Sequence, residues 1–80
     1  MTVGEAVRAR IAELIKEHNL TINKLAMKSG ITQSTLQNIT GGRNHSASVS
    51  TIQKLCDGLG ISLRDFFNSD LFDDLEQEVR

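Results

Sequence analysis

The sequence lacks proline, tryptophan and tyrosine altogether, and it has one cysteine and three phenylalanines among 80 residues. A single cysteine excludes an intrachain disulfide and leaves no pair for a zinc knuckle or a redox motif, which is typical of a reducing compartment. No apolar run approaches the length of about 18 residues that spans a membrane. A chain this short buries only about 60% of its unfolded surface. These absences predict a small soluble protein that encloses no large cavity.

Signals for export and for catalysis are missing as well. The stretch Met1–Glu5 has neither the basic region nor the apolar region of a signal peptide, so we expect a cytoplasmic location. The lone Cys56 falls on an apolar stripe, where a buried and unreactive thiol is expected. No His, Cys or carboxylate pair has metal-ligand spacing, and Gly41-Gly42 lacks the context of a phosphate loop. We therefore expect no enzymatic activity, no metal and no cofactor.

Acidic residues are absent from the middle of the chain. The net charge is −1, but residues 1–69 carry eight basic and five acidic residues, net +3, and residues 70–80 carry one basic and five acidic residues, net −4. No Asp or Glu lies between His18 and Cys56. The basic residues of that stretch are Lys24, Lys28, Arg43 and Lys54. This distribution fits a nucleic-acid-binding surface and an ordinary solvated face equally well.

Apolar residues recur at helical spacing and no proline interrupts them, so an all-α fold is expected. The spacing predicts an amphipathic helix over Gly4–His18. A second helix over about 22–29 would be capped by Thr21 and stopped by Gly30, which accepts positive φ. After a tight turn, a third helix follows over about 33–40, short and mostly polar.

Further helices are predicted downstream. Ser48 or Ser50 opens a fourth helix that ends between Gly58 and Gly60. Its apolar stripe consists of Val49, Ile52, Leu55, Cys56 and Leu59. A single turn then begins at a capping-box pattern, Ser62-Leu63-Arg64-Asp65, and brings two aromatic residues to the core, Phe66 and Phe67.

The last residues, 70–80, combine acids at the start with an apolar stripe, which predicts a sixth, acidic amphipathic helix. The stripe consists of Leu71, Phe72, Leu75 and Val79. Three roles remain open for this extension. It packs on its own domain, it forms a dimer contact, or it competes with DNA for the basic face.

The stretch Ile22–Ile39 is the most informative about function. Two short helices joined by a tight glycine-containing turn, the second rich in amide and hydroxyl groups, form the arrangement that places one helix in the DNA major groove. The sequence resembles the Cro/lambda-repressor-like helix-turn-helix family, also called the XRE family, over roughly residues 5–67. The resemblance is carried by Leu25-Ala26, Gly30-Ile31, Thr32-Gln33-Ser34-Thr35-Leu36, Ile39 and Gly42, followed by Val49, Ile52, Leu55, Leu59-Gly60-Ile61-Ser62-Leu63 and Phe66-Phe67.

The resemblance implies a compact five-helix, phage-repressor-like helix-turn-helix domain over residues 1–69, with residues 70–80 as an acidic C-terminal extension. It also implies a sequence-specific transcriptional regulator, a repressor that inserts the helix of residues 33–40 into the major groove of a pseudo-palindromic operator. Members of the family usually bind such operators as homodimers, and residues 61–79 supply the apolar surplus for self-association.

The base-reading residues follow from the periodicity of the third helix. With Leu36 and Ile39 inward, the opposite face presents Gln33, Ser34, Gln37 and Asn38. In the resembled family the first, second and sixth positions of this helix make most base contacts, which here are Gln33, Ser34 and Asn38. Amide side chains pair with adenine, and the helix has no arginine to read guanine, so we expect an A·T-leaning half-site.

Phosphate contacts would position this helix on the duplex. The candidates are Thr21, Asn23, Lys28, Thr32, Thr35, Arg43, Asn44 and His45. The sequence departs from the family at two positions: Ile22 stands where many members have glutamine, and Ala47 where many have proline. Ile22 and the acidic extension also favour an alternative reading, a protein-interaction module such as an antitoxin or anti-repressor that keeps the fold.

Overall fold

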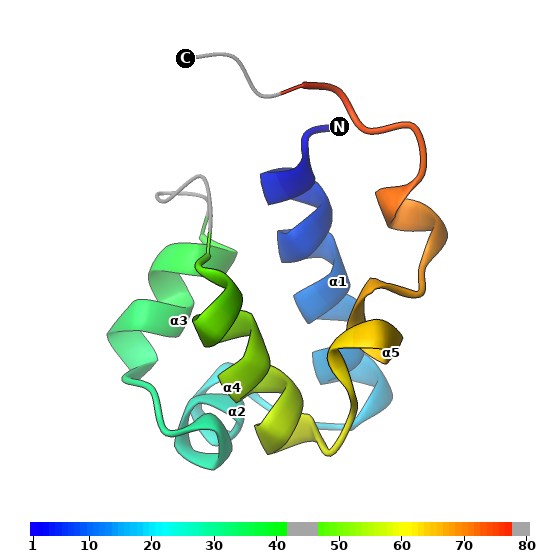
Figure 1. The fold of residues 1–80 in the computed structure, drawn as a ribbon. Coiled ribbons are helices and arrows are strands. Elements are labelled where there is room, and N and C mark those ends of the chain that lie inside the picture. The colour runs from blue at the N-terminus through cyan, green and yellow to red at the C-terminus, as the bar shows by residue number, and fades with distance from the viewer. Residues whose placement is uncertain (42–46, 78–80) are drawn as a thin grey trace.

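The computed structural model describes residues 1–41 and 47–77, and these ranges form five α-helices and one short 3-10 helix. The elements are α1 (Val3–Glu17), α2 (Ile22–Ser29), α3 (Gln33–Thr40), α4 (Val49–Leu59), α5 (Leu63–Phe67) and the 3-10 helix η1 (Asp70–Phe72). In Figure 1, α3 lies on one side of the molecule, α5 and η1 on the other, and α1 between them. The all-α, five-helix prediction is confirmed.

Each α-helix begins at a hydroxyl side chain that accepts a hydrogen bond from the backbone N–H three residues later. These caps are Thr2, Thr21, Thr32, Ser48 and Ser62, with donor–acceptor distances of 3.3, 3.1, 3.0, 3.1 and 3.0 Å. The first helix starts before the predicted Gly4 because Thr2 and Glu5 form a reciprocal capping box. Left-handed residues end three of the helices, namely Asn19 (φ 58°), Gly30 (φ 71°) and Gly60 (φ 73°).

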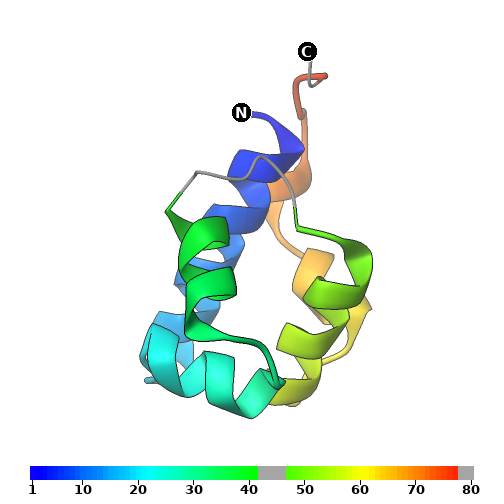
Figure 2. The same ribbon diagram turned by 90° about the vertical axis from the view of Figure 1, so that its left-hand side faces the viewer.

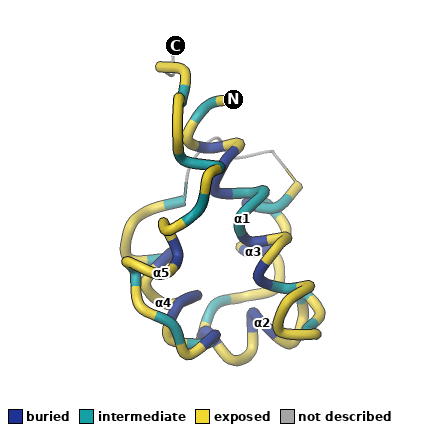
Figure 3. The backbone as a smooth tube through the Cα atoms, turned by 90° about the vertical axis from the view of Figure 1, so that its right-hand side faces the viewer, coloured by how far each residue is buried: buried dark blue, intermediate teal, exposed yellow. Residues whose placement is uncertain are grey.

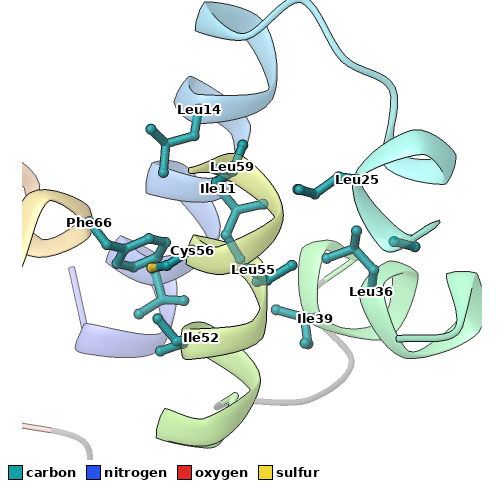
Figure 4. Packing of buried hydrophobic residues seen from close by; sticks show 12 residues of the cluster. Ile11, Leu14, Leu25, Leu36, Ile39, Ile52, Leu55, Cys56, Leu59 and Phe66 are labelled. Carbon is teal, nitrogen blue, oxygen red and sulfur yellow. The ribbon is translucent and has the colours of Figure 1, made fainter. Parts of the chain in front are cut away.

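The core lies where the inward faces of α1 to α5 meet. Its largest fully buried side chains are Phe66, Ile11, Leu25, Leu36, Leu55 and Cys56, and Figure 4 shows those of α4 lying between residues of α1 and α3. Two predicted core residues are not buried. Val49 is 68% exposed, because it occupies the first position of α4. Phe67 is 39% exposed and stacks edge-on against Phe66, with ring centroids 4.9 Å apart.

Helices α2 and α4 approach each other closely at Gly58. Helix α4 ends at Leu59, between Gly58 and Gly60 as predicted, so Gly58 lies in its last turn and Gly60 is its C-cap. A Cβ atom added there would lie 2.4 Å from Ser29 Oγ and 3.0 Å from the Ser29 backbone nitrogen. The absence of a side chain at Gly58 therefore allows α2 to rest on α4 almost backbone to backbone.

Residues 70–77 do not form the predicted amphipathic helix. Only η1 is helical, and the chain then turns at Asp74, whose φ is 53°. The segment runs alongside the start of α1, where Thr2 and Glu76 form a parallel β-bridge and the Glu76 N–H donates to the Met1 carbonyl at 3.0 Å. Figure 3 shows the segment beside the N-terminal turn of α1. Spacing alone misled the prediction, because Phe72 packs on the core from a 3-10 turn. Val79 lies outside the described residues.

A half-buried arginine, Arg10, joins α5 to α1. Arg10 Nε donates to the Phe66 carbonyl at 2.7 Å, and Nη2 donates to the Asp65 carbonyl at 2.8 Å. Its Nη1 forms an ion pair with Glu13 at 3.1 Å. These bonds serve backbone carbonyls at the end of α5, where the Asp65 carbonyl also accepts from the Asn68 N–H at 3.3 Å.

Candidate nucleic-acid interface

The turn between α2 and α3 is fixed by its own backbone and by two buried leucines. The N–H groups of Gly30 and Ile31 donate to carbonyls of the last turn of α2, at 3.3 and 3.2 Å. Thr32 then caps α3. Leu25 from α2 and Leu36 from α3 are both fully buried, so the two helices are anchored to the same core. The position of α3 relative to α2 is therefore fixed, and the outer face of α3 is held at the surface.

Helix α3 carries the predicted reading residues on its outward side. Gln33, Ser34 and Gln37 are exposed, whereas Leu36 and Ile39 are buried, at 0% and 5% exposure. The fourth residue, Asn38, is half-buried. Its amide group has less freedom than the other three side chains to follow a base edge.

Five of the predicted phosphate-contacting residues lie in α2 and α3 or cap these helices. Thr21, Asn23, Lys28, Thr32 and Thr35 are all exposed. Arg43, Asn44 and His45 lie outside the described residues. The threonines at positions 32 and 35 are joined, because the Thr32 hydroxyl donates to the Thr35 hydroxyl at 2.8 Å while it accepts from the Thr35 N–H. A helix leaves its first N–H groups without intrahelical partners, so the start of α3 offers donors to an anion.

Ile22 is a structural residue in this fold. It is half-buried and packs against the core. The start of α2 therefore exposes the Thr21 and Asn23 side chains and has no glutamine at position 22. Packing against the core thus explains why position 22 is isoleucine and not the glutamine of many family members.

A hydroxyl cluster that the sequence analysis did not single out lies at the start of α4. Ser48 Oγ lies 3.2 Å from Ser50 Oγ and 2.9 Å from Thr51 Oγ1. Ser48 and Ser50 are exposed. Three of the four residues from Ser48 to Thr51 carry hydroxyl groups, in the part of the chain without acids. This local composition is the sequence signal that could have indicated the cluster.

Charge is divided between the two sides of the molecule. Lys24 and Lys28 of α2 are exposed, within a stretch that contains no acid. Figure 2 shows α3 facing the viewer, with α2 below it and the acidic C-terminal segment behind α1. The described part of that segment therefore packs on its own domain and does not cover α3.

The cysteine of the chain, Cys56, lies on the buried face of α4, as predicted. Cys56 is 1% exposed. Burial raises the pKa of its thiol, and Asp57 and Asp65 raise it further, so the thiol is protonated at neutral pH. Within residues 1–41 and 47–77, no three His, Cys, Asp or Glu side chains are grouped to hold a metal ion. Across the same ranges, no helix has the length and apolarity to cross a membrane.

Comparisons with known proteins agree with this geometry. The family model described as the Cro/C1-type HTH DNA-binding domain matches residues 10–70. A solved structure is similar over nearly the whole chain, the crystal structure of the prophage Lp1 protein 11, with a TM-score of 0.81 and 40% sequence identity. The alignment covers 94% of this chain and 99% of that one. The search among curated proteins gave no match.

Proposed function

The chain belongs to the Cro/C1-type helix-turn-helix DNA-binding family, and we propose that it is a transcriptional repressor that binds a pseudo-palindromic operator as a homodimer through α3. The main support is the outer face of α3, where Gln33, Ser34 and Gln37 are exposed on a helix anchored by buried leucines. The likeness to a prophage protein supports a regulator of the phage repressor kind. Such a regulator acts in the cytoplasm and needs no small-molecule cofactor.

Base reading is assigned to four residues of α3: Gln33, Ser34, Gln37 and Asn38. Glutamine and asparagine pair bidentately with adenine N6 and N7, whereas serine discriminates less between bases. The exposed Gln37 lies one helical turn after Gln33, so both amides face the same groove. A half-site centred on adenines suits this set of side chains.

Positioning is assigned to exposed residues around the two helix starts and to Lys28. These are Thr21, Asn23, Lys28, Thr32 and Thr35, together with Arg43, Asn44 and His45 of the loop after α3. The first N–H groups of α2 and α3 add donors for phosphate oxygens. These contacts are independent of sequence, so they supply affinity and orientation but no discrimination.

Dimerisation is assigned to residues 61–79. The described part of this region has one open groove of about 600 Å³, lined by Leu63, Arg64, Asp65, Phe67 and Asn68. Phe67 stacks on Phe72 with ring centroids 4.9 Å apart, so α5 and η1 form one apolar strip at this surface. Binding of a pseudo-palindromic operator by the homodimer requires two copies of α3 about 34 Å apart, the spacing of successive major grooves.

A binding-site selection on random duplex DNA, followed by titration of the selected duplex, tests the proposal. We expect Gln37→Ala to weaken binding of the selected duplex by about 1–3 kcal/mol and to leave random duplex binding unchanged. Lys28→Ala should weaken both duplexes alike, because it removes a phosphate contact. The matched control is Gln53→Ala, an exposed glutamine of α4, which should affect neither.

The same titration distinguishes the repressor proposal from the alternative that the chain is a protein-interaction module. A pure interaction module of this fold would bind no random duplex even at about 50 mM salt, where phosphate contacts are strongest. Absence of DNA binding there would refute the repressor proposal. An equal loss for Gln37→Ala and Gln53→Ala would refute the assignment of base reading to α3.

A further inference from the structure

Thr32, the cap of α3, and Thr35, in the first turn of α3, are joined by two hydrogen bonds. The Thr32 hydroxyl accepts from the Thr35 N–H at 3.0 Å and donates its own hydrogen to the Thr35 hydroxyl oxygen at 2.8 Å. A hydroxyl group has a single hydrogen to donate. The Thr32 hydroxyl therefore has no hydrogen left for an acceptor outside the chain, although its side chain is exposed.

The Thr35 hydroxyl keeps its own hydrogen for an outside acceptor. It accepts from Thr32 and donates to no group in the part of the chain that the structure describes. A helical threonine can donate to the carbonyl four residues earlier, and Thr40 of the same helix does so. The Thr40 hydroxyl donates to the Leu36 carbonyl at 3.1 Å and to the Gln37 carbonyl at 3.4 Å. The two threonines of α3 thus differ in what their hydroxyl groups can bind.

Thr35 lies at the edge of the exposed face of α3. Leu36 and Ile39 are buried, so Ser34 lies near the middle of the opposite face, and Thr35 is displaced from Ser34 by about 100° around the helix axis. When a helix lies in the major groove, the middle of its outer face meets base edges and its flanks meet the sugar-phosphate backbone. The group closest to the Thr35 hydroxyl would then be a phosphate, whose oxygens accept hydrogen bonds and cannot donate them.

We propose that Thr35 donates its hydroxyl hydrogen to a DNA phosphate, and that Thr32 is a positioning residue that keeps this hydroxyl in the donor orientation. The inference rests on the proposed DNA-binding function and separates the roles of two residues that were both assigned to phosphate. Thr32 acts through Thr35 and not by a contact of its own. A hydroxyl that is oriented before binding loses less rotational freedom when the complex forms.

Replacing single hydroxyl groups of α3 by methyl groups tests the direct contact. Thr35→Val should weaken binding of the selected duplex about tenfold for each half-site, because a hydrogen bond to a charged group is lost. Thr35→Ser carries a hydroxyl and should recover most of that affinity. The matched control is Thr40→Val, which removes a hydroxyl whose hydrogen is bound within the helix and should leave the affinity unchanged. Equal losses in the two valine variants would overturn the inference.

Duplexes that carry one neutral methylphosphonate in each strand identify the acceptor. In a self-complementary form of the selected duplex, this modification neutralises the same phosphate in both half-sites. At one position we expect Thr35→Val to bind as tightly as the native chain, because the charged acceptor is gone. At all other positions the native chain should bind more tightly. A difference that persists at every position would overturn the inference, because the acceptor would then be a base.

Thr32→Asn separates positioning from capping. Asparagine caps a helix at least as well as threonine, so the thermal midpoint should be kept. Its amide oxygen accepts from the Thr35 N–H but brings no hydroxyl hydrogen to Thr35, whose own hydrogen can then turn toward that oxygen. We expect Thr32→Asn to weaken binding about as much as Thr35→Val, and the double variant to lose no more than Thr35→Val alone. Thr32→Ser carries the hydroxyl and should recover most of the affinity.

The combination of variants distinguishes positioning by Thr32 from a contact of its own. Additive losses in the double variant would overturn the positioning role, because Thr32 and Thr35 would then bind DNA independently. Native affinity in Thr32→Asn would overturn it as well. If the native chain bound neither the selected duplex nor random duplex, the DNA-binding function itself would be refuted.

Discussion

The α2–α3 pair and the C-terminal region, residues 61–77, are both short polar segments resting on one core, but different interactions fix them. In α2–α3 the decisive bonds are local, made by Thr21, Thr32 and Gly30 to residues within four positions. In the C-terminal region they span the chain, because Arg10 bonds residues 55 and 56 positions away. Sequence patterns describe the first kind of segment well and the second kind poorly.

The largest effect should come from the C-terminal region, at the pair Phe66 and Phe67. Phe66 is fully buried, so Phe66→Ala should cost about 3–5 kcal/mol of the free energy of unfolding. Phe67 is 39% exposed, so Phe67→Ala is the matched control and should cost about 1 kcal/mol. Urea denaturation measures both. Similar losses would show that α5 is packed differently from the structure described.

Arg10→Ala should destabilise the fold by about 2–3 kcal/mol, because two backbone carbonyls of α5 lose a charged donor. The Glu13 side chain of its ion pair is exposed to solvent, so that pair contributes little to the free energy of unfolding. Arg10→Lys keeps the charge but not the two separate donors, so we expect it to recover only a minor part. Lys16→Ala, an exposed residue of the same helix, should change the midpoint little; a comparable loss there would contradict the assignment.

Gly58→Ala tests the close approach that seats α2 on α4. We expect a loss of about 1–3 kcal/mol from overpacking, although alanine is the better helix former by about 1 kcal/mol. Adding Ser29→Ala removes the nearest atom but leaves the Ser29 backbone nitrogen at 3.0 Å, so thermal unfolding should show partial rescue. Full rescue would mean that only the hydroxyl is in contact. The single change Ser29→Ala should be neutral or stabilising, since its Oγ is buried without a partner.

Thr32→Ala tests the local interactions that fix the α2–α3 pair. Loss of the N-cap of α3 should cost about 1 kcal/mol, and Thr32→Ser should retain most of the stability, because the hydroxyl still accepts from the Thr35 N–H. Chemical denaturation of the three proteins measures the difference. Equal stability of the alanine and threonine proteins would show that the cap does not hold α3.

The smallest expected effect is a pH dependence at the start of α1. The Thr2 N–H donates to the Glu5 carboxylate at 2.8 Å and holds its pKa below the ordinary value. A lowered folded-state pKa stabilises the fold above the unfolded-state value, and this stabilisation is lost as the pH falls through the folded-state pKa. Glu5→Gln should therefore flatten the acid side of the stability curve, measured as the thermal midpoint against pH. An unchanged curve would contradict the capping box.

Much of the fold follows from local patterns. Helix starts coincide with Thr21, Thr32 and Ser62, and helix ends with Asn19 and Gly30, because capping and positive φ involve only neighbouring residues. The exposure of Gln33, Ser34 and Gln37 follows from the burial of Leu36 and Ile39 on the other face of α3. The half-burial of Asn38 does not follow, because it depends on tertiary surroundings that helical periodicity cannot supply.

The errors lie where one local pattern permits several packings. Residues 70–77 have helical spacing, but η1 packs against α1 and the backbone of Glu76 pairs with Met1 and Thr2. Phe66 and Phe67 are adjacent and chemically identical. Which one is buried depends on how α5 is oriented on the core, and the hydrogen bonds from Arg10 to the Asp65 and Phe66 carbonyls help to fix that orientation. The close approach of α2 to Gly58 was not predicted, because it depends on the position of Ser29 in space.

The sequence alone determined the helix-turn-helix, because caps, a left-handed glycine and apolar spacing act over a few residues and suffice to define α2 and α3. It also determined the division of charge along the chain, +3 against −4. Only the tertiary structure decided where that charge lies, because the position of the acids relative to α3 depends on contacts between the two ends of the chain. Those contacts place the negative segment behind α1, on the side away from α3.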